Sequence, residues 1–125
     1  MSRASKIFFS SLSILLLTAS LSSAQETTSV VQGERVFKAY CAACHSIGAG
    51  VVVGPDLKGV TERRSAGWLN EFIREPARMV REKDATAVRL VAQFDGYVMP
   101  TLGLSEKNIV EVISFLRSKA RKSGE

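Results

Sequence analysis

The sequence predicts an all-α domain built from about four short helices and irregular loops. Four segments place apolar residues on one face at helical spacing. Two stretches between them, 47–58 and 95–104, contain several glycines and prolines and are therefore expected to be loops. The 125 residues show no internal repeat and no linker, so we expect a single small domain.

The first predicted helix leads directly into the first cysteine of the chain. Gly33, Val36, Phe37 and Tyr40 occupy positions i, i+3, i+4 and i+7, which share one helix face. The residues before this helix, 25–29, are polar and are expected to form a loose tail.

Cap residues predict where the other three helices begin and end. The second begins after Ser65 and should stop near Glu75, because Pro76 disfavours helical geometry in the residue before it. The third begins at Asp84, and the last has Ser105 as its N-cap. The apolar faces of these helices consist of Trp68, Leu69, Phe72 and Ile73, then Ala87, Leu90, Val91 and Phe94, and finally Ile109, Val112, Ile113 and Leu116.

The amino terminus has the features of a secretory signal. Arg3 and Lys6 make the start positive, and an apolar stretch follows over 7–21. Small residues up to Ala24 then form a cleavage site. Because the apolar stretch is shorter than a membrane-spanning helix, we predict that 1–24 is a signal peptide that is cleaved. The expected location of the mature chain, 25–125, is the periplasm.

The charge balance excludes few partners by itself. Without the signal, the formal net charge falls from +5 to +3. No nucleic-acid-binding motif accompanies the basic residues, so we expect no nucleic-acid partner. No later segment has transmembrane length, so we also expect no stable membrane span.

Residues 41–45 form a C-x-x-C-H string, the pattern for covalent attachment of a c-type haem. The thiols of Cys41 and Cys44 would add to the haem vinyl groups as thioethers, and the imidazole of His45 would ligate the iron. These are the only two cysteines and the only histidine in the chain. The string predicts one haem c, with Cys41 and Cys44 as its covalent attachment points.

Three other interpretations of the cysteine pair fit less well. A structural zinc ion needs four ligands, whereas this chain offers only three nitrogen or sulfur groups of that kind. A thioredoxin-like pair would follow a strand, whereas the sequence before Cys41 is predicted to be helical. A disulfide would close so short a loop that it would remove little chain entropy.

The second axial ligand of the iron is expected to be a methionine, because the chain has no second histidine. Met1 leaves with the signal, so Met79 and Met99 are the candidates. Met99 lies in a loop before Pro100, which holds its backbone extended. Met79 precedes a charged run, which indicates a solvent-facing or core-edge position. We therefore predict His45 and Met99 as the axial ligands.

With these residues, the chain resembles a small class I bacterial cytochrome c over nearly all of residues 30–120. Besides the string from Cys41 to His45, Gly33 and Phe37 match the amino-terminal helix of that family. The resemblance implies that Gly33 allows a close crossing with the carboxy-terminal helix, where Phe115 matches the usual aromatic. It also implies the cytochrome c fold.

Two further site residues follow from the resemblance. The stretch 54–57, Gly-Pro-Asp-Leu, resembles the loop in which the carbonyl of Pro55 accepts a hydrogen bond from the haem-ligating histidine. Trp68 resembles the tryptophan near a haem propionate, and ordinary core packing explains it equally well. The stretch 99–105 resembles the axial-methionine loop of the family.

The resemblance and the predicted ligands together indicate a periplasmic electron-transfer protein rather than an enzyme. With His45 and Met99 both bound, the iron has no open position and is suited to one-electron transfer. We expect a monomer or a subunit of a complex, with a redox protein donor and acceptor such as an oxidase or reductase complex. Two alternatives stay open: a subunit fixed in a respiratory or sulfur- or nitrogen-oxidoreductase complex, and an open-site haem enzyme or gas sensor.

Overall fold

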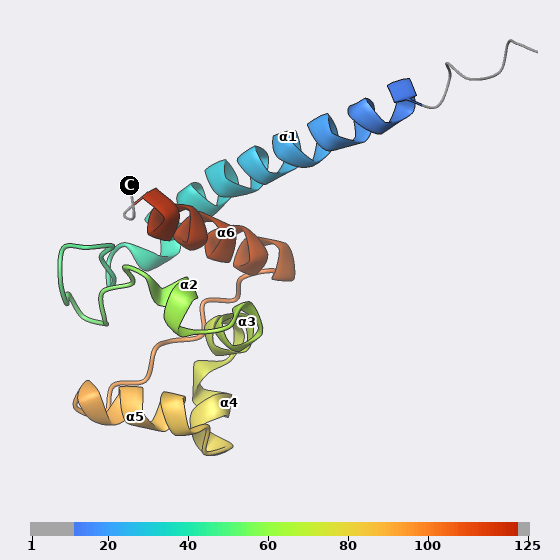
Figure 1. Ribbon diagram of the computed structural model, residues 1–125. Coiled ribbons are helices and arrows are strands. Elements are labelled where there is room, and N and C mark those ends of the chain that lie inside the picture. Colours follow the sequence, from blue (N-terminus) through green and yellow to red (C-terminus); the bar gives the residue numbers. More distant parts are fainter. Residues whose placement is uncertain (1–11, 123–125) are drawn as a thin grey trace, which may run out of the picture.

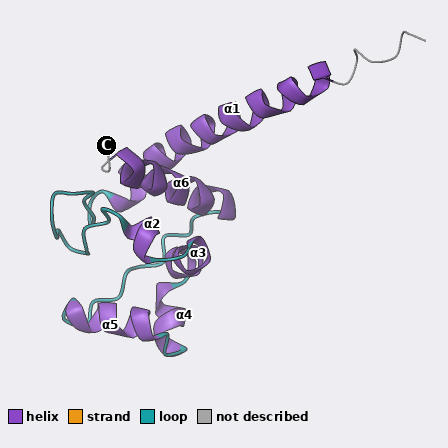
Figure 2. Ribbon diagram, viewed as in Figure 1, coloured by secondary structure: helices purple, strands orange, loops and turns teal. Residues whose placement is uncertain are grey.

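The computed structural model describes residues 12–122 as a helical domain in which α6 lies across α1 (Figure 1). Helices and loops make up this part of the chain, with no strand (Figure 2). The predicted all-α class is confirmed. The elements are α1 (Leu12–Val36), a π-helical turn η1 (Phe37–Cys41), α2 (Val60–Arg63), α3 (Ala66–Arg74), α4 (Pro76–Arg81), α5 (Ala85–Gln93) and α6 (Glu106–Lys122).

The crossing of α1 and α6 forms the larger part of the core. Gly33 is buried at the crossing, where a β-carbon on it would lie 1.9 Å from the Glu111 carbonyl oxygen. One turn later, the rings of Phe37 and Phe115 meet with their centroids 5.6 Å apart. Val36, Val112 and Leu116 complete this buried cluster. The close crossing expected from Gly33 is therefore present.

A second cluster joins α3 to α6. Leu69 is buried against Ile109 and Ile113, and Leu104 packs against both this cluster and the first. Ile109 is fully buried. Some apolar residues of α6 therefore contact α1 and others contact α3. Because Leu104 packs against both clusters, α3 lies beside the end of the 95–104 loop.

The predicted N-caps lie where the sequence placed them. The Ser65 hydroxyl accepts a hydrogen bond from the Trp68 backbone N–H at 3.2 Å. The Asp84 carboxylate accepts from the second and third backbone N–H groups after it, at 3.1 and 2.8 Å. The Ser105 hydroxyl accepts from the Asn108 N–H at 3.2 Å. Each cap satisfies a donor that the first turn of its helix leaves without a partner.

The expected number of helices was too low. The described residues contain six α-helices, because two short ones, α2 and α4, carry no strong apolar periodicity. Pro76 ends α3 as predicted and also occupies the first position of α4, where the missing N–H costs nothing. Residues 25–29, expected to be a loose tail, are a mostly exposed part of α1 instead.

Part of the predicted signal peptide lies outside the residues that the structure describes. Residues 1–11, including Arg3 and Lys6, are outside the described residues, and α1 continues without a break past Ala24. Cleavage after Ala24 stays a prediction. In the described part of the chain, no helix combines the length and apolar character that crossing a membrane requires.

Candidate functional site

The residues from Cys41 to His45 form a single compact turn after the π-helical end of the first helix. The Ala42 N–H donates to the Phe37 carbonyl at 2.9 Å, which is the wider π-helical spacing. The Cys41 carbonyl then accepts from the N–H groups of both Cys44 and His45, at 3.0 and 2.9 Å. This turn brings two thiols and an imidazole to one side of the backbone. Such π-helical segments are frequent at functional sites.

The ring of His45 is held from two sides. Its Nδ1 lies 2.8 Å from the Pro55 carbonyl oxygen. The Cα of Gly54 packs so closely on the ring that a β-carbon there would lie 2.5 Å from His45 Cε1. Because Pro55 engages Nδ1, the nitrogen that this arrangement leaves for an iron is Nε2.

The loop that carries Gly54 and Pro55 is folded around one carboxylate. Asp56 accepts hydrogen bonds from the backbone N–H groups of Lys58 at 2.8 Å, Gly48 at 2.8 Å and Gly50 at 2.7 Å. These bonds, that from Lys58 first, hold the pKa of Asp56 far below its usual range. An aspartate in a glycine-rich loop is the sequence signal for this role, and it was missed.

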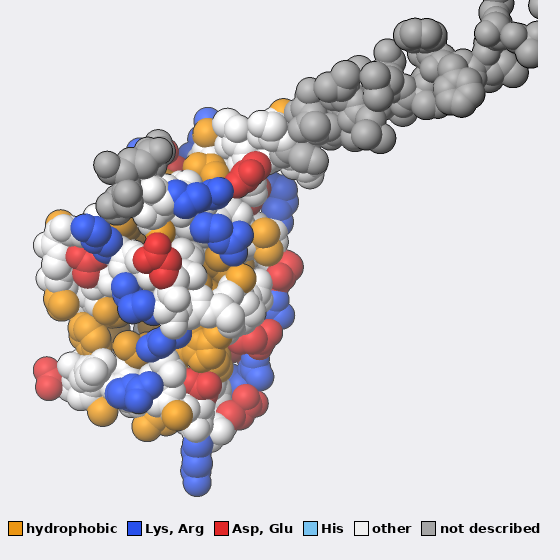
Figure 3. Space-filling view, viewed as in Figure 1, with side chains coloured by type: hydrophobic (Ala, Val, Ile, Leu, Met, Phe, Trp, Pro, Cys, Tyr) orange, Lys and Arg blue, Asp and Glu red, His pale blue; other side chains and the backbone are white. Residues whose placement is uncertain are grey.

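A largely apolar cavity of about 330 Å³ opens between the turn at 41–45, the loop that carries Asp56, and helices α3 and α5. Figure 3 shows hydrophobic side chains around a recess on this face. All six predicted site residues line the cavity: Cys41, Cys44, His45, Pro55, Trp68 and Met99. Ring and aliphatic side chains from several elements complete it, among them Leu57, Phe72, Ile73, Leu90, Val91, Phe94, Val112 and Leu116.

The two candidate methionines lie in different places. Met99 is half-buried and lines the cavity together with Pro100 and His45. Met79 is buried in α4, with 8% of its surface exposed, and does not line the cavity. Of the two positions expected for Met79, solvent-facing or at the core edge, the solvent-facing one is therefore wrong. Helix α4, which carries Met79, contacts both α3 and α5.

Trp68 is at the cavity wall, with its N–H directed to a protein partner. The indole Nε1 donates to the Asp84 carboxylate at 3.2 Å, and the ring stacks on Phe72 with centroids 4.8 Å apart. The Arg64 guanidinium lies 5.6 Å from the ring centroid. Bonds from the Ala87 N–H and then from Trp68 keep the pKa of Asp84 below its usual range. The role of Trp68 beside a propionate stays a prediction.

The three consecutive valines of the loop, at 51–53, lie mostly at the surface. Val51, Val52 and Val53 are exposed by 67%, 54% and 46% of their surface, and no strand forms there. Only Val53 reaches the cavity. Apolar residues of α3 and α5 line the cavity instead, and the bonds to Asp56 hold the loop in its folded form.

The local chemistry argues against a redox-active dithiol. Burial, with the nearby Cys44, raises the pKa of the Cys41 thiol to about 11. A catalytic pair needs a lowered thiol pKa, so Cys41 lacks the required thiolate character. No disulfide joins Cys41 to Cys44. Within residues 12–122, no three His, Cys, Asp or Glu side chains are grouped to hold a metal ion on their own.

Replacing Asp56 with asparagine is expected to destabilise the protein more at neutral pH than in acid. The lowered pKa means that the ionised carboxylate contributes stability above about pH 4, and this contribution is lost as the pH falls through the folded-state pKa. Urea unfolding at about pH 7 and about pH 3 checks this.

The difference between wild type and D56N should shrink in acid, and a difference that is equal at both pH values would contradict the role of Asp56. Asp95→Asn is the matched control. The Asp95 side chain is exposed and has no hydrogen bond within the described residues. It should leave both unfolding curves unchanged.

Known proteins similar to this chain are cytochromes c. The cytochrome c family model matches residues 30–120. Over 34 residues the chain is 50% identical to a cytochrome c-553-like protein of Synechocystis sp., a match covering 27% of this chain and 32% of that protein. The chain thus matches about a third of that relative's length.

Solved structures agree over a larger share of the chain. A cytochrome c from Rhodothermus marinus superposes with a TM-score of 0.72 at 29% identity, covering 77% of this chain and 80% of that one. The cytochrome c domain of a Pseudomonas putida protein gives 0.64 at 33% identity, covering 72% and 89%. An engineered form of the Rhodothermus marinus protein, bound to a carbene intermediate, gives 0.67 at 29% identity, covering 76% and 80%.

Proposed function

This chain belongs to the cytochrome c family and carries covalent haem c for electron transfer, and we propose that it is a periplasmic one-electron carrier. Its axial ligands in this proposal are His45 and Met99. The observation that carries the proposal is that one cavity is lined by the two thiols, the imidazole and the Met99 thioether.

The residues around the cavity fit a haem. Cys41 and Cys44 form no disulfide and lie on the turn that also presents His45. The cavity wall is apolar apart from a few groups, which suits the faces of a porphyrin. Because Gly54 has no side chain, the His45 ring can lie directly against its backbone. These features support attachment through Cys41 and Cys44 and ligation by His45.

The haem, when bound, supplies an iron that exchanges one electron between Fe(III) and Fe(II). The chain supplies the surroundings that set the potential. The Pro55 carbonyl orients the His45 ring, and the thioether of Met99 favours the reduced state. Apolar residues such as Leu57, Phe72 and Phe94 exclude water from the cavity, which raises the potential further.

Open-site chemistry is the second candidate. The observation that favours it is the engineered relative, which holds a carbene intermediate. This function requires that Met99 leave the iron or be absent from it. Carbon monoxide binding to the reduced wild-type protein distinguishes the two, because a carrier with Met99 bound should bind it weakly and slowly.

The periplasmic location predicts a processed chain. Protein recovered from the periplasmic fraction should begin at Gln25, and its mass after denaturation should exceed that of residues 25–125 by one haem. Intact-mass measurement of each cell fraction checks this. A chain that begins at Met1 and stays with the membranes would contradict cleavage and would favour a retained anchor.

A further inference from the structure

The segment that carries Met99 has few internal restraints. Residues 98–104 make no hydrogen bond with any described residue. Met99 and Pro100 touch the cavity, and Leu104 packs against both core clusters. The position of the Met99 sulfur therefore depends on packing and on how the two ends of the segment are fixed.

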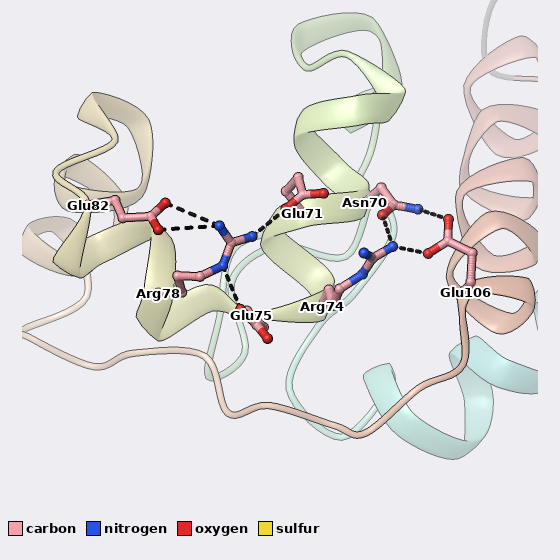
Figure 4. Close-up of polar contacts among 7 residues, drawn as sticks. All are labelled: Asn70, Glu71, Arg74, Glu75, Arg78, Glu82 and Glu106. Atoms are coloured by element: carbon pink, nitrogen blue, oxygen red, sulfur yellow. Dashed lines mark hydrogen bonds and ion pairs between the residues drawn. The ribbon is translucent and has the colours of Figure 1, made fainter.

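The carboxyl end of this segment is fixed by a polar clamp at the start of α6. Glu106, the first residue of α6, accepts a hydrogen bond from Asn70 Nδ2 at 2.8 Å and forms an ion pair with Arg74 (Figure 4). Arg74 in turn donates to Asn70 Oδ1 at 2.8 Å. Asn70 and Arg74 are one turn apart on α3, so both side chains meet Glu106 from the same helix face.

Helix α3, which carries Asn70 and Arg74, also forms a wall of the cavity. Trp68, Leu69 and Phe72 of α3 all line it. The clamp therefore ties the end of the Met99 segment to the same rigid element that bounds the haem cavity. An isolated exposed ion pair contributes little, but here two donors share one carboxylate next to a segment that has no hydrogen bonds of its own.

We propose that Glu106 is a positioning residue for Met99, and that the clamp with Asn70 and Arg74 sets how readily Met99 leaves the iron. This inference rests on the proposed ligation of the iron by Met99. Without the clamp, the segment 98–104 moves more freely, so an added ligand takes the place of Met99 more easily.

The neighbouring ion-pair network provides a matched control. Arg78 of α4 contacts Glu71, Glu75 and Glu82, as Figure 4 also shows. The Glu82 side chain is 60% exposed and that of Glu106 is 58% exposed. Both glutamates therefore form exposed ion pairs with an arginine. Only Glu106 lies at the end of the segment that carries Met99.

The experiment is an imidazole titration of the oxidised holoprotein, at a pH where imidazole is neutral. E106Q and R74Q should each bind imidazole about fivefold more tightly than wild type, whereas E82Q should stay within about twofold. Added salt should raise the affinity of wild type towards that of E106Q and leave E106Q unchanged, because salt screens the Arg74–Glu106 pair. A general loss of stability would not produce this difference in salt response.

An affinity of E106Q equal to that of E82Q would overturn the proposal, as would an equal salt response in wild type and E106Q. M99A separates this failure from failure of the proposed ligation. If M99A binds imidazole much more tightly than wild type and E106Q does not, Met99 is the ligand and only the clamp is wrong. If M99A and wild type bind imidazole equally, Met99 is not the ligand and both proposals fall.

Discussion

Replacing Met99 with alanine is expected to lower the reduction potential by on the order of 0.1–0.2 V, a part of the roughly 0.8 V range that axial ligands span. The thioether stabilises the reduced iron, and alanine cannot replace it. Met99 is the one methionine on the cavity wall, among the residues that the structure describes. The variant should also bind carbon monoxide readily when reduced. Redox titration and carbon monoxide titration measure the two effects.

Met79→Leu is the control for that substitution. Met79 is buried in α4 and does not line the cavity, so leucine should keep the potential and the spectrum of wild type. An unchanged potential and spectrum in M99A would reject Met99 as a ligand. A shift in M79L of the same size as in M99A would show that the potential responds to packing rather than to ligation.

Replacing Gly33 with alanine is expected to reduce the free energy of unfolding by about 3 kcal/mol, at the upper end of the usual cost of overpacking. The added β-carbon would lie 1.9 Å from the Glu111 carbonyl oxygen and 2.8 Å from the Phe115 β-carbon. Backbone cannot move as a flexible side chain can, so α1 and α6 would have to separate. Denaturant unfolding of the holoprotein measures the loss.

Gly67→Ala is a control that should change the free energy of unfolding in the opposite direction. Gly67 lies in α3, is exposed, and has nothing within 4 Å of the position of an added β-carbon. Alanine there should stabilise the protein by roughly 0.5–1 kcal/mol because it favours the helix. If both variants destabilised the protein by the same amount, the close crossing at Gly33 would not be the cause.

Local chemistry made much of the fold predictable. Ser65, Asp84 and Ser105 each begin a helix with a side-chain acceptor, and Pro76 ends one by its effect on the preceding residue. These signals depend on neighbours in sequence. The short helices α2 and α4 have too few residues for periodicity to show, and their helical state depends on tertiary packing.

The site was predictable where a motif specified it. The string from Cys41 to His45 and the Met99–Pro100 dipeptide indicated residues that the fold brings to one cavity. Contacts between residues that are far apart in the sequence could not be predicted in this way. The bond from Trp68 to Asp84 and the clamp on Glu106 join residues on different helices, and no sequence pattern relates them. The exposure of Val51 likewise depends on how Asp56 folds the loop.

We propose that one covalent haem lies between His45 and Met99 and carries single electrons. A redox titration of the purified protein, followed by absorption spectroscopy, tests it most directly. The predicted result is one reversible one-electron transition, with the sulfur-to-iron charge-transfer band of methionine ligation present in the oxidised protein. A protein without covalently bound haem, or an oxidised spectrum lacking that band, would contradict this ligation.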